Sequence, residues 1–195
     1  MSSQEKPKRK IDRREEKLYE PIKYLLEIMF RKYVEKDAEV QKKLQREPTF
    51  FDKEAQDIYL EITANGRFSE FLKEQLDDRA LSIINVERFS PDIMGFVRKT
   101  KSSPKELITV EVKAQPLTLK NISRAKLYQD IFRAEYGMLV STSRISEELR
   151  RFILDRHTIR GNIIIAQYIE ALRVIRIHPS FKDYIPNFLQ EFTKH

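Results

Sequence analysis

Two carboxylates and a lysine stand at positions where a pair of short strands would bring them together. Asp92 directly precedes an apolar segment, residues 93–97, while Glu111 and Lys113 stand two residues apart within residues 106–113. Apolar and polar side chains alternate in the second segment, as they do in a strand, so Glu111 and Lys113 share one face. If the two strands pair as a hairpin, Asp92 lies near Glu111. Clustered carboxylates need a neutralising cation, and oxygen ligands of this kind suit Mg²⁺.

A sheet must position these side chains, and the surrounding segments predict one. Residues 81–86 are apolar and β-branched, and they predict a first core strand that would continue into the hairpin as an antiparallel meander. Residues 118–135 have helical spacing, and residues 136–141 predict a further strand. The expected order is a strand that carries Glu111, a crossover helix and then a second strand. This order indicates that the two strands pair in parallel through a right-handed connection. The expected fold class is therefore α/β, or α+β by another convention.

The N-terminal part of the chain predicts a basic arm followed by a long helix. Residues 1–17 contain many Lys and Arg and almost no apolar side chains, so a disordered arm is expected, which would either contact phosphates or only aid solubility. The helix is expected to begin at Pro21, which suits the first helical position, and to end before Pro48. Residues 57–63 fit either a helix or a strand, and a second helix is expected from Phe68.

The rest of the chain is expected to complete a single domain, residues 18–195, with its core at about residues 68–142. A chain of 195 residues can bury such a core without disulfides. Beyond the core, the patterns predict a helix at residues 146–156, capped by Ser146, and a strand at residues 162–166. Residues 171–177 are left undecided, and a C-terminal helix is expected at residues 184–192.

The composition narrows the classes of function. Lys and Arg number 37 against 30 Asp and Glu, and the net charge of +7 is compatible with a polyanionic partner. The chain has no cysteine, which excludes thiol chemistry, zinc–thiolate sites and disulfides. No apolar run is long enough for a membrane helix, and no apolar signal segment follows the basic N-terminus. A cytoplasmic protein with no membrane partner is therefore expected.

The sequence Pro91-Asp92, followed after a hairpin-length gap by Glu111-Val112-Lys113, resembles the signature of the PD-(D/E)XK nuclease superfamily. This superfamily includes restriction endonucleases, archaeal Holliday-junction resolvases and RecB-type nuclease domains. The resemblance implies a restriction-endonuclease-like fold, which is a mixed central sheet flanked by helices, here with a helical N-terminal extension. It also implies a metal-dependent nuclease that hydrolyses phosphodiester bonds in DNA.

The resemblance covers about residues 81–142 and implies roles for the motif residues. Asp92 and Glu111 would bind one or two Mg²⁺ ions, for which Mn²⁺ can substitute, together with the backbone carbonyl of Val112. The ion would activate a water for in-line attack on phosphorus and stabilise the developing charge. Lys113 would orient that water, help to deprotonate it, or stabilise charge directly. The expected partner is DNA, with RNA as an alternative, and a homodimer is an open expectation because many relatives of this kind are dimers.

Two further site residues are implied by the resemblance. In RecB-like members a glutamine on the helix after the Glu-x-Lys strand approaches the metal, and Gln129 resembles it. Because Gln129 falls on the apolar stripe of its helix, a structural hydrogen bond to the sheet is an equal alternative. Such sites often include a glutamate from a helix, and Glu20, Glu70 and Glu74 are the candidates. Glu70 is slightly favoured because it is close to the sheet in sequence.

The sequence leaves other functions open. One is a nucleic-acid-binding module of the same fold without catalysis, and another is an RNA nuclease on a similar scaffold. A third is a structural or adaptor protein in which Glu111 and Lys113 form an ordinary ion pair on an amphipathic hairpin. The patterns do not settle the structure of the substrate, endonuclease against exonuclease action, or the need for a partner protein.

Overall fold

A computed structural model describes residues 12–43, 57–87, 89–99, 103–155, 163–178, 185 and 187–193 of the chain. It has a mixed α/β fold with one six-stranded sheet in the order β1-β2-β3-β4-β5-β6. The strands are β1 (Asp57–Ile62), β2 (Ile93–Arg98), β3 (Glu106–Lys113), β4 (Tyr136–Ser141), β5 (Ile163–Ile169) and β6 (Val174–Ile177). Strands β3, β4 and β5 are parallel, whereas β1, β2 and β6 pair antiparallel with their neighbours. The expected α/β class with a mixed sheet is confirmed.

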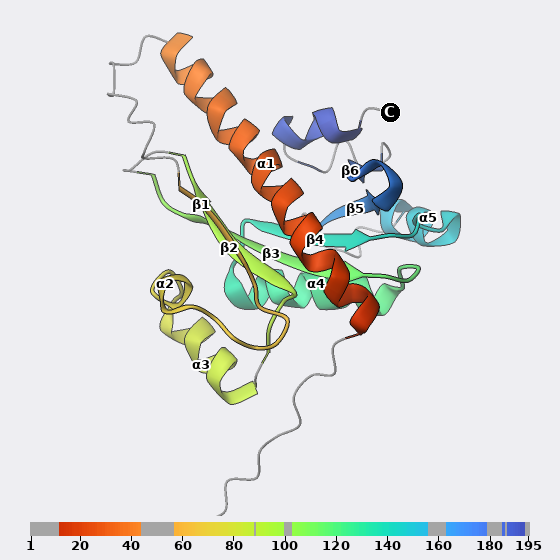
Figure 1. Ribbon diagram of the computed structural model, residues 1–195, viewed down its shortest axis with the longest axis horizontal. Coiled ribbons are helices and arrows are strands. Elements are labelled where there is room, and N and C mark those ends of the chain that lie inside the picture. The colour runs from red at the N-terminus through yellow and green to blue at the C-terminus, as the bar shows by residue number, and fades with distance from the viewer. Residues whose placement is uncertain are drawn as a thin grey trace, which may run out of the picture.

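Helices cover both faces of this sheet (Figure 1). They are α1 (Arg13–Lys43), α2 (Glu70–Lys73), α3 (Asp78–Glu87), α4 (Leu119–Phe132) and α5 (Glu147–Asp155), with 3₁₀ helices η2 (Glu170–Leu172) and η4 (Asn187–Thr193). The long helix α1 crosses one face, and α4 lies on the opposite face. A second cluster of buried side chains joins α2, α3 and α4 to that opposite face through Met94 and Phe96 of β2.

Strand β3 is central to both layers because its side chains alternate as predicted. Ile108, Val110 and Val112 are fully buried in the core that also contains the apolar stripe of α1. Glu111 and Lys113 lie on the other face, where Glu111 contacts α4. Near its C-terminal end, β3 therefore presents Val110 and Val112 to the α1 layer and Glu111 to the α4 layer.

The hairpin and the crossover expected from the sequence are confirmed. Strands β2 and β3 pair antiparallel, with Ile93 opposite Val110. Helix α4 begins after Thr118, whose hydroxyl accepts a hydrogen bond from the backbone N–H of Asn121, as a helix cap does. Strand β4 then pairs parallel with β3.

Residues 81–86, which we expect from their composition to form the first core strand, belong to helix α3, and that prediction is wrong. Asp77 starts the helix, because its Oδ1 accepts a hydrogen bond from the backbone N–H of Ala80 at 2.8 Å. Ala80 and Ile84 lie one turn apart and are both buried in the second core cluster. The strand beside β2 is β1 instead, so the undecided segment 57–63 forms a strand over residues 57–62.

Helix α1 begins at Arg13, two turns before the expected start at Pro21. Residues 13–17, which are expected to lie in a disordered arm, are therefore helical, while residues 1–11 of that arm lie outside the described residues. Leu18 and Tyr19 are buried against the sheet. This packing outweighs the helical hydrogen bond that a proline inside the helix removes.

The C-terminal elements form the β5–β6 edge of the sheet and the helices beside it. Ser146 caps α5 as expected, because its Oγ accepts a hydrogen bond from the backbone N–H of Leu149 at 3.2 Å. The undecided residues 171–177 contain β6, and the expected C-terminal helix is the 3₁₀ helix η4. Among the helices described, none combines the length and the apolar character that crossing a membrane requires.

Gly95 allows strands β1 and β2 to approach closely. It lies in the middle of β2, opposite Leu60 of β1. A Cβ atom added to Gly95 would come within 1.8 Å of the backbone carbonyl oxygen of Tyr59. Any side chain at this position would therefore force the two backbones apart.

Candidate active site

Asp92 is held in place by backbone and side-chain hydrogen bonds at the start of β2. Its backbone N–H donates to the carbonyl oxygen of Val110 at 2.9 Å, and its own carbonyl oxygen accepts from the N–H of Thr63 at 2.9 Å. The carboxylate, which is fully buried, accepts from the N–H of Val112 at 2.7 Å and from the hydroxyl of Tyr19 at 3.3 Å. This side chain therefore has a single, well-defined position beside β3.

Glu111 is the second buried carboxylate, and two cations contact it. Its Oε1 lies 2.9 Å from Nζ of Lys113 on the same strand and 3.4 Å from Nε of Arg124 on α4. Arg124 is itself oriented by Tyr128, whose hydroxyl accepts from both its Nε and its Nη2. The shared strand face predicted for Glu111 and Lys113 is thus confirmed, and α4 closes the far side of the pair.

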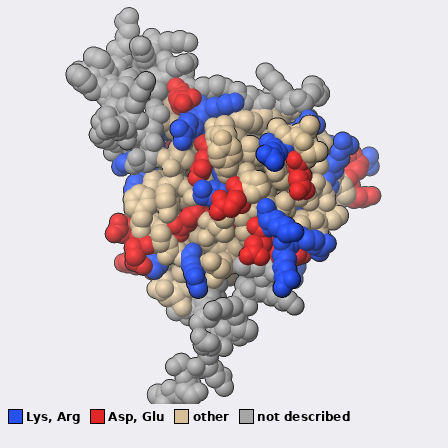
Figure 2. Space-filling view, viewed as in Figure 1, with Lys and Arg blue, Asp and Glu red and all other residues tan. Residues whose placement is uncertain are grey.

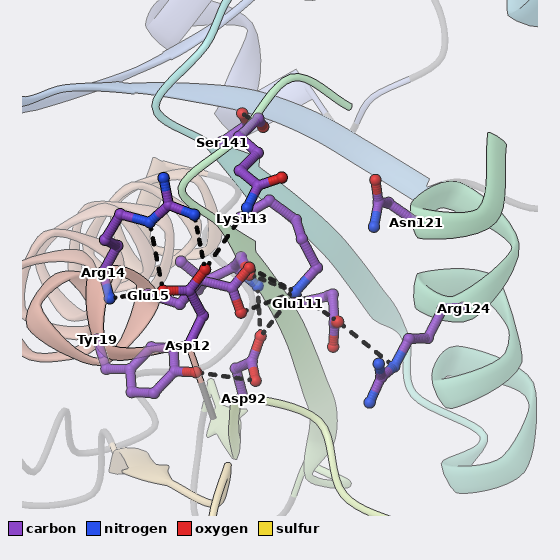
Figure 3. Close-up of polar contacts among 12 residues, drawn as sticks. Asp12, Arg14, Glu15, Tyr19, Asp92, Glu111, Lys113, Asn121, Arg124 and Ser141 are labelled. Carbon is purple, nitrogen blue, oxygen red and sulfur yellow. Dashed lines mark hydrogen bonds and ion pairs between the residues drawn. The ribbon is translucent and has the colours of Figure 1, made fainter. Parts of the chain in front are cut away.

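A third carboxylate, from Glu15 in the first turn of α1, completes the cluster. Nζ of Lys113 donates to Oε1 and Oε2 of Glu15 at 3.2 and 3.1 Å, and to the carbonyl oxygen of Val112 at 2.7 Å. Oδ2 of Asp92 lies 3.9 Å from the same ammonium group. Figure 3 shows the three acidic side chains pointing toward Lys113 from α1, β3 and the segment before β2. The ammonium group therefore occupies the point on which these oxygen atoms converge.

Carboxylates outnumber cations among the contacts described in this cluster. The carboxylates of Glu15, Asp92 and Glu111 face the two cations Lys113 and Arg124. All three acidic residues are less than 10% exposed. Because buried carboxylates are stabilised by positive charge beside them, the cluster is suited to binding cations.

The donor atoms also fit a particular kind of metal ion. The oxygen atoms of three carboxylates and of the Val112 carbonyl all lie within contact distance of one ammonium group, with no nitrogen or sulfur donor among them. Oxygen-only sets of this kind suit Mg²⁺ or Mn²⁺. Among the described residues, no three acidic or histidine side chains are placed so that they could hold a metal ion together. Lys113 and an ion would therefore have to share these oxygen atoms.

Charged side chains of both signs lie at the edge of the cluster. The carboxylate of Asp12 accepts hydrogen bonds from Arg14 and, at 3.5 Å, from Nε2 of Gln115 in the loop after β3. The hydrogen bonds from Arg14 lower the pKa of Asp12. Figure 2 shows Lys and Arg side chains, with Asp and Glu beside them, at the end of the molecule where α1 begins. The net positive charge is therefore not concentrated in a patch of one sign on this face.

Gln129 is buried as predicted, yet the structure does not bring it to the carboxylates. Its Oε1 accepts from Nζ of Lys126 at 3.3 Å, and its Nε2 donates to the carbonyl oxygen of Glu135 at 3.5 Å. Helix α4 begins near the C-terminal end of β3, and Gln129 stands five residues beyond Arg124, about 7.5 Å further along the axis. Arg124 is thus an α4 residue that reaches Glu111, whereas these hydrogen bonds of Gln129 join it to its own helix and to the residue before β4.

The three candidate helix glutamates also lie away from the cluster. Glu20, Glu70 and Glu74 are exposed, and Glu70 forms a surface ion pair with Lys73 at 2.6 Å. Glu15 occupies the position that the resemblance implies for one of them. A signal for it exists in the sequence, because Glu15 stands three, four and seven residues before three buried apolar residues, Leu18, Tyr19 and Ile22, and so lies on the stripe of α1 that faces the core.

The geometry supports chemistry that requires a cation and a positioned ammonium group beside carboxylates. Comparisons of the chain with known proteins found no matching family model, no matching curated protein and no matching solved structure. The arrangement of Glu15, Asp92, Glu111 and Lys113 is therefore the observation on which a function must be argued.

Proposed function

We propose that this protein is a metal-dependent nuclease of the restriction-endonuclease-like fold that hydrolyses phosphodiester bonds in DNA. The observation that carries the proposal is the convergence of Asp92 and Glu111, from two paired strands, on the ammonium group of Lys113. The order of the elements supports it too, because an antiparallel hairpin carries the motif and a helix then leads to a parallel strand.

Each residue of the cluster has a role in this proposal. Asp92, Glu111, Glu15 and the carbonyl of Val112 would hold Mg²⁺, which would supply a polarised water and stabilise charge on the phosphoryl oxygens. Tyr19 and the backbone N–H of Val112 fix the Asp92 carboxylate beside β3, and the other ligands and Lys113 would have to adjust around it when an ion binds.

The two cations of the cluster would act on the substrate side. Lys113 is a hydrogen-bond donor within 3.2 Å of both Glu15 and Glu111, and it would orient the attacking water or contact the phosphate. Arg124 is about one-third exposed, which leaves part of its guanidinium open to an anion. A metal ion held by the carboxylates would add positive charge on the same side, toward the phosphate of the substrate.

One observation favours a second candidate, a nucleic-acid-binding module without catalysis. The ammonium group of Lys113 already contacts Glu15, Glu111 and the Val112 carbonyl, so it can neutralise the carboxylates without a metal. In that case the cluster would only join α1 to β3. The two candidates differ in whether divalent cations bind to the folded protein.

Cleavage of a labelled panel tests the proposal directly. The panel contains single-stranded, duplex, flap and junction DNA, together with RNA of matching sequence, each incubated with Mg²⁺, with Mn²⁺ or with EDTA. We expect metal-dependent cleavage of DNA that is lost in Asp92→Ala. Asp130→Ala is the matched control, because Asp130 is an exposed carboxylate on α4 that pairs with Lys126.

The pattern of results separates the candidates. Full cleavage by Asp92→Ala, or loss of cleavage by Asp130→Ala as well, would contradict the assignment of the site. Salt-dependent binding with no cleavage of any substrate would support the binding module instead. Cleavage confined to RNA would keep the site and change the substrate.

A further inference from the structure

A pocket of about 300 Å³ opens on the same edge of the sheet, beyond β4. Its polar lining comes from Ser143 and Arg144 after β4, Gln167 on β5, and Arg176 and His178 at β6. Leu117, Ile145 and Ile165 supply apolar walls. With Thr193, the described lining contains two guanidinium groups, an imidazole, an amide and two hydroxyls, and no carboxylate is among these residues, which is the chemistry of an anion site.

The two arginines of this pocket have no acidic partner within the part of the chain that the structure describes. Their neighbours on α5 differ in this respect, since Arg150 and Arg151 both pair with Glu147. Arg144 is exposed and Arg176 is half-buried, so both guanidinium groups are accessible from solvent. Cations that remain unneutralised beside a concave surface favour a bound anion.

The register of the sheet connects the pocket to the candidate active site. Lys113 is opposite Ser141, Ser141 is opposite Gln167, and Gln167 is opposite Arg176. These four residues form one row across the sheet, on the same face. Because adjacent strands are about 4.8 Å apart, Gln167 and Arg176 lie about 10 and 14 Å from Lys113 along this row. Measured along the axis of a duplex, where each base pair rises about 3.4 Å, that separation corresponds to about three or four base pairs.

The loop between β3 and α4 borders both sites. Gln115 in this loop contacts Asp12 at the edge of the carboxylate cluster, and its carbonyl oxygen accepts a hydrogen bond from Ser141 at 3.0 Å. Two residues later, Leu117 lines the pocket. The two sites are therefore neighbours on one continuous edge.

We propose that this pocket binds a phosphate group of the nucleic-acid strand, a few nucleotides from the phosphodiester that the carboxylate cluster would cleave. The inference rests on the proposed function and adds to it the means by which the strand is held. Arg144 and Arg176 would supply the charge, and Gln167, His178 and Ser143 the further hydrogen-bond donors. Such a contact fixes position without reading sequence.

His178 gives the pocket a measurable signal. Its burial, and next the charge of Arg150, lower the pKa of the imidazole, while Glu147 acts in the opposite direction. A phosphate group beside it would favour the protonated form and move the titration of His178 to higher pH. Arg144 and Arg176 are the other charged groups that line the pocket.

Binding of DNA in the absence of cleavage tests the pocket. The full chain is titrated, in EDTA, against a 12-nucleotide strand labelled at its 3′ end and carrying either a 5′-phosphate or a 5′-hydroxyl. We expect the double variant Arg144→Gln/Arg176→Gln to weaken binding about tenfold and to lower the slope of log K against log salt by about 0.7 for each phosphate that the protein no longer neutralises. Arg151→Gln is the matched control, because Arg151 is 70% exposed on α5 and does not line the pocket.

A second readout does not depend on affinity. The C2 proton of His178, assigned by its absence in His178→Gln, is followed by NMR during pH titrations with and without the strand or inorganic phosphate. A shift of its titration to higher pH with either anion supports the pocket.

The binding experiment also identifies which phosphate the pocket holds. If the double variant loses less affinity for the 5′-hydroxyl strand than for the 5′-phosphate strand, the ligand is the end of a strand. Equal losses of affinity would identify an internal phosphate.

The outcomes distinguish this inference from the proposed function. Unchanged affinity and salt slope in the double variant, or an equal loss in Arg151→Gln, would overturn the pocket. If these results accompanied metal-dependent cleavage that needs Asp92, the nuclease would stand and the pocket would fall. If no substrate were cleaved but the double variant bound DNA more weakly and His178 responded, the pocket would stand and the nuclease would fall.

Discussion

Replacing Lys113 with methionine tests whether its ammonium group holds the three carboxylates together. Methionine is one atom shorter than lysine, keeps most of the apolar stem and removes the charge. The lysine Nζ lies 2.9 Å from Glu111 and 3.1 Å from Glu15, and at an effective dielectric constant of about 20 each pair is worth about 5–6 kcal/mol before desolvation. Desolvation of the ammonium group offsets several kcal/mol of this. Because the side chain is only 12% exposed, we expect a net loss of about 3–5 kcal/mol, the range for breaking a buried pair.

The assay is urea unfolding followed by circular dichroism at pH 7 in EDTA. A loss of this size lowers the midpoint at constant slope and corresponds to a decrease of about 10 °C in Tm. The control is Lys126→Met, the same change at a lysine that pairs with Asp130 on the surface of α4, where we expect a loss below about 1 kcal/mol. Equal losses in the two variants would show that Lys113 does not hold the carboxylates.

Added Mg²⁺ extends the same experiment to the metal site. If the three carboxylates accept an ion, Mg²⁺ at about a hundred times its Kd should restore about 2.7 kcal/mol to Lys113→Met. The wild type should gain less, since its ammonium group competes for the same oxygens. No stabilisation of either protein by Mg²⁺ or Mn²⁺ would remove the metal from the proposed function.

Three further results are expected. Glu15→Gln should reduce the rate of DNA cleavage by a larger factor than Glu16→Gln, its exposed neighbour, and equal rates would exclude Glu15 from the site. For His178, burial and Arg150 lower the pKa below its usual 6.5, so the unfolded chain takes up a proton first as pH falls. The stability that neutral His178 contributes is therefore fully present above pH 6.5 and is lost as the pH falls below that value. The difference in urea midpoint between wild type and His178→Gln should consequently shrink from about pH 7.5 to about pH 5.5. A constant difference would contradict the burial. Gly95→Ala should destabilise the fold by about 1–3 kcal/mol, because its Cβ would overlap the Tyr59 carbonyl, and an unchanged Tm would contradict that close approach.

The sequence predicts those parts of the fold in which local pattern and burial agree. Strands β2, β3 and β4 and helix α4 fall close to their expected bounds, because alternation or helical spacing coincides with a buried face in each. The pattern fails at residues 81–86, where β-branched residues suggest a strand. Two features of α3 outweigh that preference. They are the hydrogen-bonded cap at Asp77 and the packing of Ile84 one turn after Ala80, and the strand propensity of residues 81–86 reflects neither of them.

The candidate site divides in the same way. Asp92, Glu111 and Lys113 follow from local spacing on a hairpin, and the structure brings them together. Glu15 and Arg124 come from helices whose docking depends on the tertiary fold. The spacing of Glu15 along α1 indicates that it faces the core, but it does not indicate which residues it meets there. Gln129 shows the converse, since its buried position is predictable from periodicity while its partners depend on where α4 lies over the sheet.

The dependence of the cluster on α1 has a consequence for how this chain folds. Glu15 and Tyr19 are synthesised before their partners Lys113 and Asp92, which follow 98 and 73 residues later. Contacts of such high sequence separation form slowly, because a long loop must close first. Until the sheet exists, the apolar stripe of α1 has no surface to cover and is open to chaperones or to aggregation. The helix that completes the cluster is thus synthesised before the sheet and can dock only after the sheet has formed, so the site is assembled late in folding.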